Sequence, residues 1–351
     1  MPEWTTRPAT LDDREGALAL MDRAFAPSRH RIELWDWAFA SNPNTNDLYY
    51  MVADTGTSLV AQYAAVPVAM QHQGRPILGL LSMFTATDPD FRGRGLFRTL
   101  ARALYERTRE TCPVIFGFPN DKSGPIFYTH LGWTELRPFP LLRRPLRNTA
   151  HHVNGGWVTS LCARALDILG AIGIDRSITV VQVESFAGVA NPLWSQIKSR
   201  VGTAIVRDET FLNWRFVQSP FTYTRLVALR EGEPVGLAVV AADNSNGKAR
   251  LMELMVSPGE KLAVTRTLLA RVIELATDSG EYGLGFVATP RHPQHKTMIA
   301  GGLLPAWSSF LPPGDERAGS FGVRVNGRAV DPSRVLHIDD WHLSSADQDW
   351  L

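Results

Sequence analysis

The sequence predicts a mixed α/β (α+β) protein whose two halves are related to each other. The segment WAFASNP at 37–43 returns as WRFVQSP at 214–220, with Trp, Phe and Pro at the same spacing and an offset of 214 − 37 = 177 residues. After each copy come a β-rich hairpin, a strand, a helical stripe and another strand. Because this order of elements accompanies the match, we interpret the chain as an internal duplication rather than a chance similarity.

Length and composition agree with two globular domains. A chain of 351 residues is long for a single core. We expect one domain at 1–150, a linker helix at 151–177 and a second domain at 178–351. The composition, 44% hydrophobic and 20% charged, is ordinary for a globular protein. The formal net charge of +1 provides no basic field, so nucleic acid is not an expected partner.

The cysteines and the apolar segments favour a cytoplasmic protein. Cys112 and Cys162 form no CxxC pair and are interpreted as reduced, buried thiols. The N-terminus has acidic residues where a signal peptide needs a basic start. The most apolar segment, 157–174, is shorter than the roughly 20 residues of a membrane span and contains Arg164 and Asp167. We therefore expect a connecting or interfacial helix there, and no membrane span.

A glycine-rich segment, RGRG at 92–95, connects an apolar strand to a helix. The preceding run, PILGLLSMFTATDPDF at 76–91, is mostly apolar and contains Asp-Pro near its end, which is typical of a buried strand. Downstream, apolar residues recur at the helical positions i, i+3, i+4 and i+7. These residues are Phe97, Leu100, Ala101 and Leu104. The ring of Phe97 is therefore expected to point into the core.

This strand-to-helix turn is suited to a phosphate group. The first turn of a helix leaves backbone N–H groups unpaired and carries a partial positive charge. Glycines let a ligand approach those groups closely, and arginines add positive charge around them. The arginines are Arg92, Arg94, Arg98 and Arg102. Neither GxxxxGK[ST] nor GxGxxG is present, which disfavours a P-loop NTPase and a dinucleotide-binding fold.

A second informative segment follows one strand later, in GFPNDKSGPIFYTHLGW at 117–133. It contains Asn120, then a short helix with Tyr128, then Gly132 and Trp133. In this order the two segments resemble the GNAT superfamily of acyl-CoA N-acyltransferases. That family has [Q/R]-x-x-G-x-[G/A] after a strand, and later an Asn followed by Tyr-x-x-x-Gly-Phe.

The resemblance is close but has three departures. Phe97 stands where the loop pattern has Gly or Ala, and Trp133 replaces Phe in the second pattern. The interval between Asn120 and Tyr128 is one residue longer than usual. The motifs cover about residues 1–140, and the second half is similar only in outline.

The resemblance implies two tandem GNAT-like domains, each a mixed, mostly antiparallel sheet flanked by helices, with a degenerate C-terminal copy. It also implies that the first domain binds acetyl-CoA, or coenzyme A, as co-substrate. The implied cofactor-binding residues are Phe84, Thr85, Ala86, Thr87, Arg92, Gly93, Arg94, Gly95, Leu96, Phe97 and Asn120. No metal is expected.

Acyl transfer to an amine requires a neutral amine, a stabilised carbonyl oxygen and a protonated leaving thiolate. In the family, backbone N–H groups of the strand before the loop hold the carbonyl, which here are those of 84–87. The tyrosine of the second pattern protonates the thiolate, so the resemblance makes Tyr128 the candidate catalytic acid. The structural alternative is that Tyr128 only packs at the end of its helix.

The general base is left open. Candidates in the first half are His30, His72, His130, Glu33 and Asp36. In tandem GNAT proteins of the enhanced-intracellular-survival type, which resemble this chain in having a bulky residue in the loop, the chain's terminal carboxylate serves as the base. The corresponding candidates are Asp347, Asp349 and the carboxylate of Leu351, with an exposed polar tail as the alternative.

The second half lacks the phosphate loop. Its equivalent segment reads Pro-Gly-Glu-Lys at 258–261, and the negative charge of Glu260 would repel a phosphate. No Tyr-x-x-x-Gly-Phe follows. We therefore expect this domain to bind no coenzyme A, and instead to shape the acceptor cleft or to stabilise the first domain.

The expected function is N-acyl transfer from acyl-CoA to a primary amine of a small molecule, with specificity supplied by the aromatic HRIELWDWAF helix at 30–39 and the cleft between the domains. A homodimer is left open. One alternative is a non-catalytic acyl-CoA-binding module. The other is a Fem-type aminoacyl transferase, which the intact coenzyme A loop and the near-zero net charge disfavour.

Overall fold

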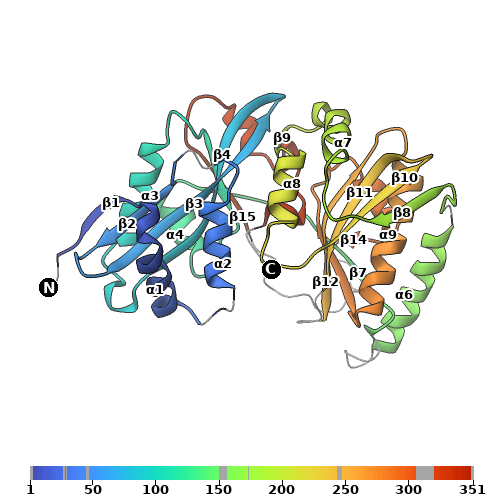
Figure 1. Ribbon diagram of the computed structural model, residues 1–351, viewed down its shortest axis with the longest axis horizontal. Coiled ribbons are helices and arrows are strands. Elements are labelled where there is room, and N and C mark those ends of the chain that lie inside the picture. Colours follow the sequence, from blue (N-terminus) through green and yellow to red (C-terminus); the bar gives the residue numbers. More distant parts are fainter. Residues whose placement is uncertain are drawn as a thin grey trace.

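The computed structural model describes residues 3–26, 28, 30–44, 47–149, 156–172, 174–242, 247–305 and 320–348. These residues form two mixed sheets that lie side by side, each flanked by helices (Figure 1). The predicted fold class, a mixed α/β chain with two mostly antiparallel sheets, is confirmed. Among the described residues, no helix combines the length and apolar character that crossing a membrane requires.

The first sheet has the strand order β1-β2-β3-β4-β5-β15-β6, with β9 pairing to the far end of β3. Its strands are β1 Thr5–Pro8, β2 Tyr50–Asp54, β3 Leu59–His72, β4 Arg75–Thr87, β5 Val114–Gly117, β15 Phe321–Val325, β6 Thr134–Leu136 and β9 Thr203–Ile205. Its helices are α1 Arg14–Ala24, α2 Arg31–Trp35, η2 Asp36–Ala40, α3 Leu96–Arg107 and α4 Gly124–His130, with short turns η1 Leu11–Asp13 and η3 Pro89–Phe91.

The second sheet has the order β8-β10-β11-β12-β13-β7-β14. Its strands are β8 Ile178–Gln182, β10 Thr224–Arg230, β11 Glu233–Ala241, β12 Lys248–Val256, β13 Gly283–Val287, β7 Leu141–Pro145 and β14 Leu304–Pro305. The helices around it are α6 Gly156–Ala171, α7 Ala190–Ile197, α8 Glu209–Phe216, α9 Lys261–Asp278 and α10 His295–Ala300, with η4 Lys198–Arg200 and η6 Ser345–Asp347. The short helix α11 Pro332–Val335 contacts β15 of the first sheet and η5 Ile338–Asp340.

The two sheets have the same topology. In each, one parallel pair, β4 with β5 or β12 with β13, stands among antiparallel neighbours. A helix joins the strands of each parallel pair, α3 in the first sheet and α9 in the second. The predicted order of hairpin, strand, helix and strand is therefore present in both halves, which agrees with an internal duplication.

Each sheet is completed by a strand from the other half of the chain. β7 follows the first sheet's elements in sequence, yet it lies in the second sheet between β13 and β14. Reciprocally, β15 comes near the end of the chain and lies in the first sheet between β5 and β6. Neither sheet is thus one continuous stretch of chain, and the domain limits 1–150 and 178–351 stay a prediction.

The two tryptophans that begin the matching segments at 37–43 and 214–220 are in contact where the two halves join. The rings of Trp37 and Trp214 stack with centroids 4.3 Å apart and an interplanar angle of 5°. The contact is reciprocal, because Trp37 Nε1 donates to the Trp214 carbonyl at 2.8 Å and Trp214 Nε1 donates to the Trp37 carbonyl at 3.1 Å. Equivalent residues of the two copies therefore make equivalent contacts, as in a two-fold interface.

The helical stripe predicted after the glycine-rich segment is confirmed in α3. Leu100, Ala101 and Leu104 are fully buried. Phe97 packs edge-on against Tyr63 and Phe127, at centroid distances of 5.7 Å and 5.3 Å. Its ring therefore joins the core, as expected, although part of it stays exposed.

The aromatic rings of the 30–39 segment are core residues. Trp35, Trp37 and Phe39 are all at most 5% exposed. Trp37 stacks on Trp214, and Phe39 packs against Tyr50 and Phe84. These rings hold the two halves and β4 together, so the acceptor contact expected of 30–39 stays a prediction for the exposed residues of the segment.

The reciprocal tryptophan pair predicts coupled energetics. Trp37→Ala and Trp214→Ala should each lower the free energy of unfolding by about 3–5 kcal/mol, because each removes a buried ring. The double variant should lose less than the sum of the two, since either single change already removes the stack and both shared hydrogen bonds. Urea unfolding of the four proteins measures this, and strictly additive losses would contradict it.

Candidate active site

The two central strands of the first sheet, β4 and β5, are hydrogen-bonded to each other over only part of their length. β4 and β5 pair in parallel only through Gly79–Leu81 and Val114–Phe116. A Cβ on Gly117 would stand 3.2 Å from the Ser82 carbonyl oxygen, so the strands are still close where their pairing stops. β4 then continues to Thr87 paired with β3 alone. The result is a notch in the sheet, one side of which is the unpaired edge of β4.

A β-bulge shapes the β4 side of this notch. The pairing with β3 shifts register between Gln62 and Ala64, which places Phe84 and Thr85 in the bulge. Phe84 has φ of 53°, a left-handed conformation that is strained for a residue with a Cβ. Gln62, which is fully buried, holds the bulge by donating from Nε2 to the Phe84 carbonyl at 2.9 Å. Phe84–Thr87, the predicted carbonyl-binding stretch, therefore lies along the notch.

The predicted phosphate loop leads from the end of β4 into α3. Asp88 ends the strand by accepting hydrogen bonds from Arg23 Nε at 2.6 Å and from the backbone N–H of Asp90. Gly93 and Gly95 both have φ of 77°, and Gly95 is the residue that precedes the first turn of α3. A Cβ at Gly93 would meet nothing within 4 Å, so the loop backbone is open to a ligand.

The surroundings of the loop are cationic. Arg92, Arg94 and Arg98 are all exposed. Arg94 donates to the Asp90 carbonyl at 3.0 Å, and its guanidinium lies 4.7 Å from the centre of the Phe91 ring. Leu96 is buried beneath the turn, so it contributes its backbone N–H rather than its side chain.

Asn120 serves a local structural purpose. Its Oδ1 accepts from the backbone N–H groups of Lys122 and Ser123, both at 3.0 Å, and so caps the turn that leads into α4. The side chain is exposed near the end of β5. Its amide N–H groups are the part of Asn120 that remains suited to a ligand, and its role in coenzyme A binding stays a prediction.

Tyr128 lies on α4, half-buried, beside the exchanged strand β15. Its Oη is 2.6 Å from Ser320 Oγ, and Ser320 in turn donates to the Pro119 carbonyl at 3.1 Å. Because the single Ser320 proton is engaged by that carbonyl, Tyr128 is the donor to Ser320. Burial raises the pKa of Tyr128 above its ordinary value, which keeps the phenol protonated near neutral pH.

Strand β15 also fits closely behind the tyrosine. A Cβ on Gly322 would lie 3.1 Å from Tyr128 Oη and 2.9 Å from the ring of Trp133. Only glycine therefore leaves room for both side chains. Ser320 and Gly322 belong to the far end of the chain, and no local motif marked either of them.

A buried chain of hydroxyl groups ties the notch to its surroundings. Trp133 Nε1 donates to Tyr105 Oη at 2.9 Å, and Tyr105 Oη lies 2.9 Å from Tyr63 Oη. Ser82 Oγ then donates to Tyr63 Oη, also at 2.9 Å. This chain connects the end of α4 with the residue at which β4 and β5 part. Trp133, which departs from the family pattern, thus has a positioning role that phenylalanine lacks.

Two of the base candidates are already paired. His72 is buried, with Nδ1 2.9 Å from Thr203 Oγ1 and Nε2 accepting from the Asp331 N–H. Asp36 forms an ion pair with Arg14 at 2.6 Å. The remaining first-half candidates, His30, Glu33 and His130, are exposed.

The other base candidates are the carboxylates at 347, 349 and 351. Asp347 is buried and paired with Arg207 at 2.7 Å inside the second half. Asp347 therefore does not lie at the notch of the first sheet and is not available there as a base. Asp349 and the Leu351 carboxylate lie outside the described residues.

The equivalent notch of the second sheet is filled by the chain itself. β12 and β13 pair only up to Arg250 and Gly285. Beyond that point the C-terminal segment 341–347 bonds to both strands. Ser345 Oγ accepts from the Val287 N–H at 3.0 Å, and Ser344 Oγ donates to Glu253 Oε2 at 2.7 Å.

The loop of the second half is also unsuited to phosphate. Glu260, at the start of α9, pairs with Arg230 at 2.8 Å, and Arg230 also contacts Asp175. The positive charge of Arg230 is therefore already balanced by two carboxylates. Together with the filled notch, this agrees with the expectation that the second domain binds no coenzyme A, which stays a prediction.

One buried cluster has the residue types of a metal site. Side-chain donors of Glu253, His292 and His342 lie within 4.8 Å of one another. However, His292 Nδ1 accepts from the Gln294 N–H at 3.2 Å, so the neutral ring carries its proton on Nε2 and has no lone pair there to offer. Glu253 is in addition paired with Arg207 at 2.6 Å. The cluster therefore does not fit a metal ion.

The same burial predicts acid sensitivity. It lowers the pKa of His292, and lowers that of His342 to about 3. Between about pH 6.5 and the lowered pKa, the histidine is protonated in the unfolded chain but stays neutral in the native protein. The free energy of unfolding therefore falls as the pH is lowered. Urea unfolding at pH 7 and pH 5.5 should show a total loss of about 1.3 kcal/mol from His342 over this interval, and a further loss of the same sign from His292. His342→Leu should reduce that loss, and an unchanged loss would contradict the assignment.

The comparisons agree with this geometry. Residues 5–136 match the family model of the acetyltransferase (GNAT) domain. The fold is similar to that of a GCN5-related N-acetyltransferase from Kribbella flavida, at 17% identity and a TM-score of 0.62, covering 92% of this chain and 71% of that one. It is also similar to N-myristoyltransferase of Saccharomyces cerevisiae with bound myristoyl-CoA, at 13% identity and a TM-score of 0.56, covering 100% and 90% of the two chains. A search of curated proteins found no match.

The fold is thus that of the GNAT type. More particularly, residues 5–136 of this chain are a GNAT acetyltransferase domain, and the second sheet, with the same strand order, is consistent with a second GNAT-like domain.

Proposed function

We propose that the protein transfers an acetyl or short acyl group from acyl-CoA directly to a primary amine of a small molecule. One observation carries the proposal. The open notch between β4 and β5, the left-handed glycine loop and Tyr128 occur together in the first domain, while the second domain has its notch filled. The protein therefore has one site of this kind among its described residues.

Acyl-CoA fits this site in two parts. The diphosphate lies at the start of α3, where Gly93 and Gly95 expose backbone N–H groups and the arginines neutralise its charge. The pantetheine arm carries amide groups, and it pairs with the free edge of β4 as an added strand would. This arrangement places the thioester beside the bulge at Phe84–Thr87.

The reaction is a single displacement. The amine nitrogen attacks the thioester carbon, a C–N bond forms, and the C–S bond breaks. Backbone N–H groups of the bulge stabilise the carbonyl oxygen as it gains negative charge. Tyr128 Oη gives its proton to the departing thiolate, and the ammonium product loses a proton to solvent or to a base.

Ser320 acts on Tyr128 as a positioning residue. In the resting geometry Ser320 Oγ accepts a hydrogen bond from the Tyr128 phenol and donates its own to the Pro119 carbonyl. Rotation of the Ser320 hydroxyl redirects that proton toward Tyr128 Oη once the phenol has been deprotonated. The second half of the chain thereby contributes to the chemistry of the first.

Loop binding is tested by Gly95→Asp, with Gly74→Asp as the matched control. Both glycines have nearly the same positive φ, 77° and 76°, so the backbone strain is similar. Gly74 lies at the distant β3–β4 turn. Gly95→Asp should weaken coenzyme A binding at least tenfold in calorimetry, because a carboxylate then faces the diphosphate, whereas Gly74→Asp should bind normally. Equal affinities of the two variants would place the site elsewhere.

The acid role is tested by the pH dependence of thiol release with acetyl-CoA and a panel of amines. Because burial raises the Tyr128 pKa, loss of the phenol proton should lower wild-type kcat only on the alkaline side, apart from the fall at low pH that protonation of the amine causes. Tyr128→Phe should lower kcat about 10²-fold or more and remove that alkaline limb. Ser320→Ala should move the limb to higher pH with little change in KM for acetyl-CoA.

The same experiment separates the proposal from its rivals. Binding of acetyl-CoA without thiol release for any amine, in wild type and Tyr128→Phe alike, would favour the non-catalytic acyl-CoA module. Transfer that requires aminoacyl-tRNA instead of acyl-CoA would favour the Fem-type activity. Comparing acetyl-CoA with longer acyl thioesters in the same assay sets the preferred chain length.

A further inference from the structure

Helix α6 lies beside α9 on the outer side of the second domain (Figure 1). Of the twelve large apolar residues that are exposed in the described chain, five lie on α6 and two directly after it, with exposures of 37–68%. We call them the α6 face: Trp157, Val158, Leu161, Ile168, Leu169, Ile172 and Ile174. The opposite side of α6, with Ser160 and Ala163, is buried against the second domain. A continuous exposed patch of this kind marks an interaction site.

The low charge of α6 and of the whole chain favours a second copy of the protein as the partner. Arg164 is the one charged residue among the exposed positions of α6, so the face has no field that would select a strongly charged partner or an anionic membrane. The whole chain has a formal net charge of only +1, so two copies scarcely repel each other. Arg164 lies at the edge of the face, where its long side chain can remain in water.

The face is also complementary to itself. When two copies of α6 are placed antiparallel about a two-fold axis between residues 164 and 165, each residue i lies opposite residue 329 − i. Trp157 then faces Ile172, and Leu161 faces Ile168. Ala165, a small residue, sits next to the axis and permits close approach of the helices. Two pairs of exposed apolar residues thus meet, one on each side of the axis.

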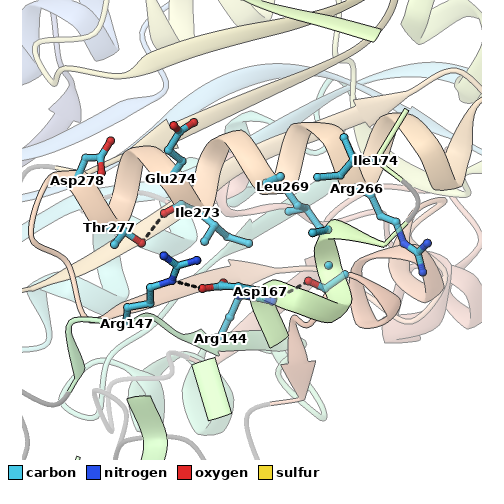
Figure 2. Close-up of a pocket in the computed structure, with 14 residues that line it drawn as sticks. Arg144, Arg147, Asp167, Ile174, Arg266, Leu269, Ile273, Glu274, Thr277 and Asp278 are labelled. Carbon is cyan, nitrogen blue, oxygen red and sulfur yellow. Dashed lines mark hydrogen bonds and ion pairs between the residues drawn. The ribbon is translucent and has the colours of Figure 1, made fainter. Parts of the chain in front are cut away.

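A cavity beside the C-terminal end of α6 offers a place for the largest side chain of the face. It has a volume of about 330 Å³ and lies between α6 and α9 (Figure 2). Leu269, Ile273 and Ile174 give it apolar walls. Glu274 and Thr277 line it as well and supply acceptors for one N–H group. This is the environment that an indole prefers, with an apolar body and a single donor.

The charges around the cavity balance, which disfavours a charged ligand. Three arginines line it, together with three carboxylates. Two of the arginines, Arg144 and Arg147, are already paired with Asp167. In the antiparallel arrangement, Trp157 of the partner lies level with Ile172, next to Ala171 at the cavity wall.

We propose that the protein forms an isologous dimer through antiparallel packing of the α6 face, with Trp157 of each copy entering the α6–α9 cavity of the other. The interface is of the kind in which a buried aromatic anchor in a pocket contributes most of the binding energy. It lies on the outer side of the second domain, so it leaves the notch of the first domain open.

The first test is the mass of the protein in sedimentation velocity over a range of concentrations. Wild type should be a dimer. Ile168→Asp should be a monomer, and Trp157→Ala should weaken the dimer at least tenfold. Leu11→Asp is the control, because Leu11 is 56% exposed on η1 of the first domain. Wild type that is monomeric throughout, or a dimer that Ile168→Asp leaves intact, overturns the proposal.

The second test reads the helix orientation by cross-linking with a short bis-maleimide in a Cys162→Ser background. Antiparallel packing brings the two copies of residue 165 within about 2 Å of each other along the helix axis, but keeps those of residue 172 about 22 Å apart. Ala165→Cys should therefore cross-link and Ile172→Cys should not. Cross-linking of both variants, or of neither, overturns the antiparallel arrangement. Monomeric protein that co-sediments with phosphatidylcholine vesicles would instead assign the face to a membrane surface.

Discussion

The exchange of one strand between the two halves is the constraint on which the rest of the structure depends. A sheet strand satisfies its backbone hydrogen bonds only when its neighbour is present. β5 and β6 of the first sheet are neighbours of β15, and β13 and β14 of the second are neighbours of β7. Each half therefore completes the other, and the reciprocal stack of Trp37 on Trp214 fixes the two halves at the same junction.

The candidate site also depends on the exchanged strand β15. Tyr128 comes from the first half, but the residue that it contacts, Ser320, precedes the exchanged strand, and Gly322 within that strand leaves it room. The notch itself needs no exchange, since it arises where β4 and β5 part. The proposed binding of acyl-CoA and the proposed protonation of the leaving thiolate therefore depend on different parts of the fold. Substitutions can separate them.

Local sequence patterns could predict the elements but not how distant ones meet. The glycine loop at 92–95, the helical stripe after it and the Tyr128 motif are short-range signals, and each lies where the pattern placed it. Ser320 lies 192 residues beyond Tyr128, and nothing in its neighbourhood marks it. The left-handed Phe84 also has no local signal, because that conformation is imposed by the bulge and by the buried amide of Gln62. Likewise, exposed and buried aromatic residues look alike in sequence, so the pattern at 30–39 could not show that Trp35 and Phe39 are buried.

The position of β15 near the end of the chain has a consequence for biosynthesis. A ribosome makes the first half of the protein long before residues 321–325, and during that interval β5 and β6 have open edges. Unpaired edges are templates for association with other chains. The growing chain consequently holds an incomplete first sheet and candidate site until residues 321–325 have been made. Truncation before residue 321 would then leave an aggregation-prone product rather than a smaller folded domain.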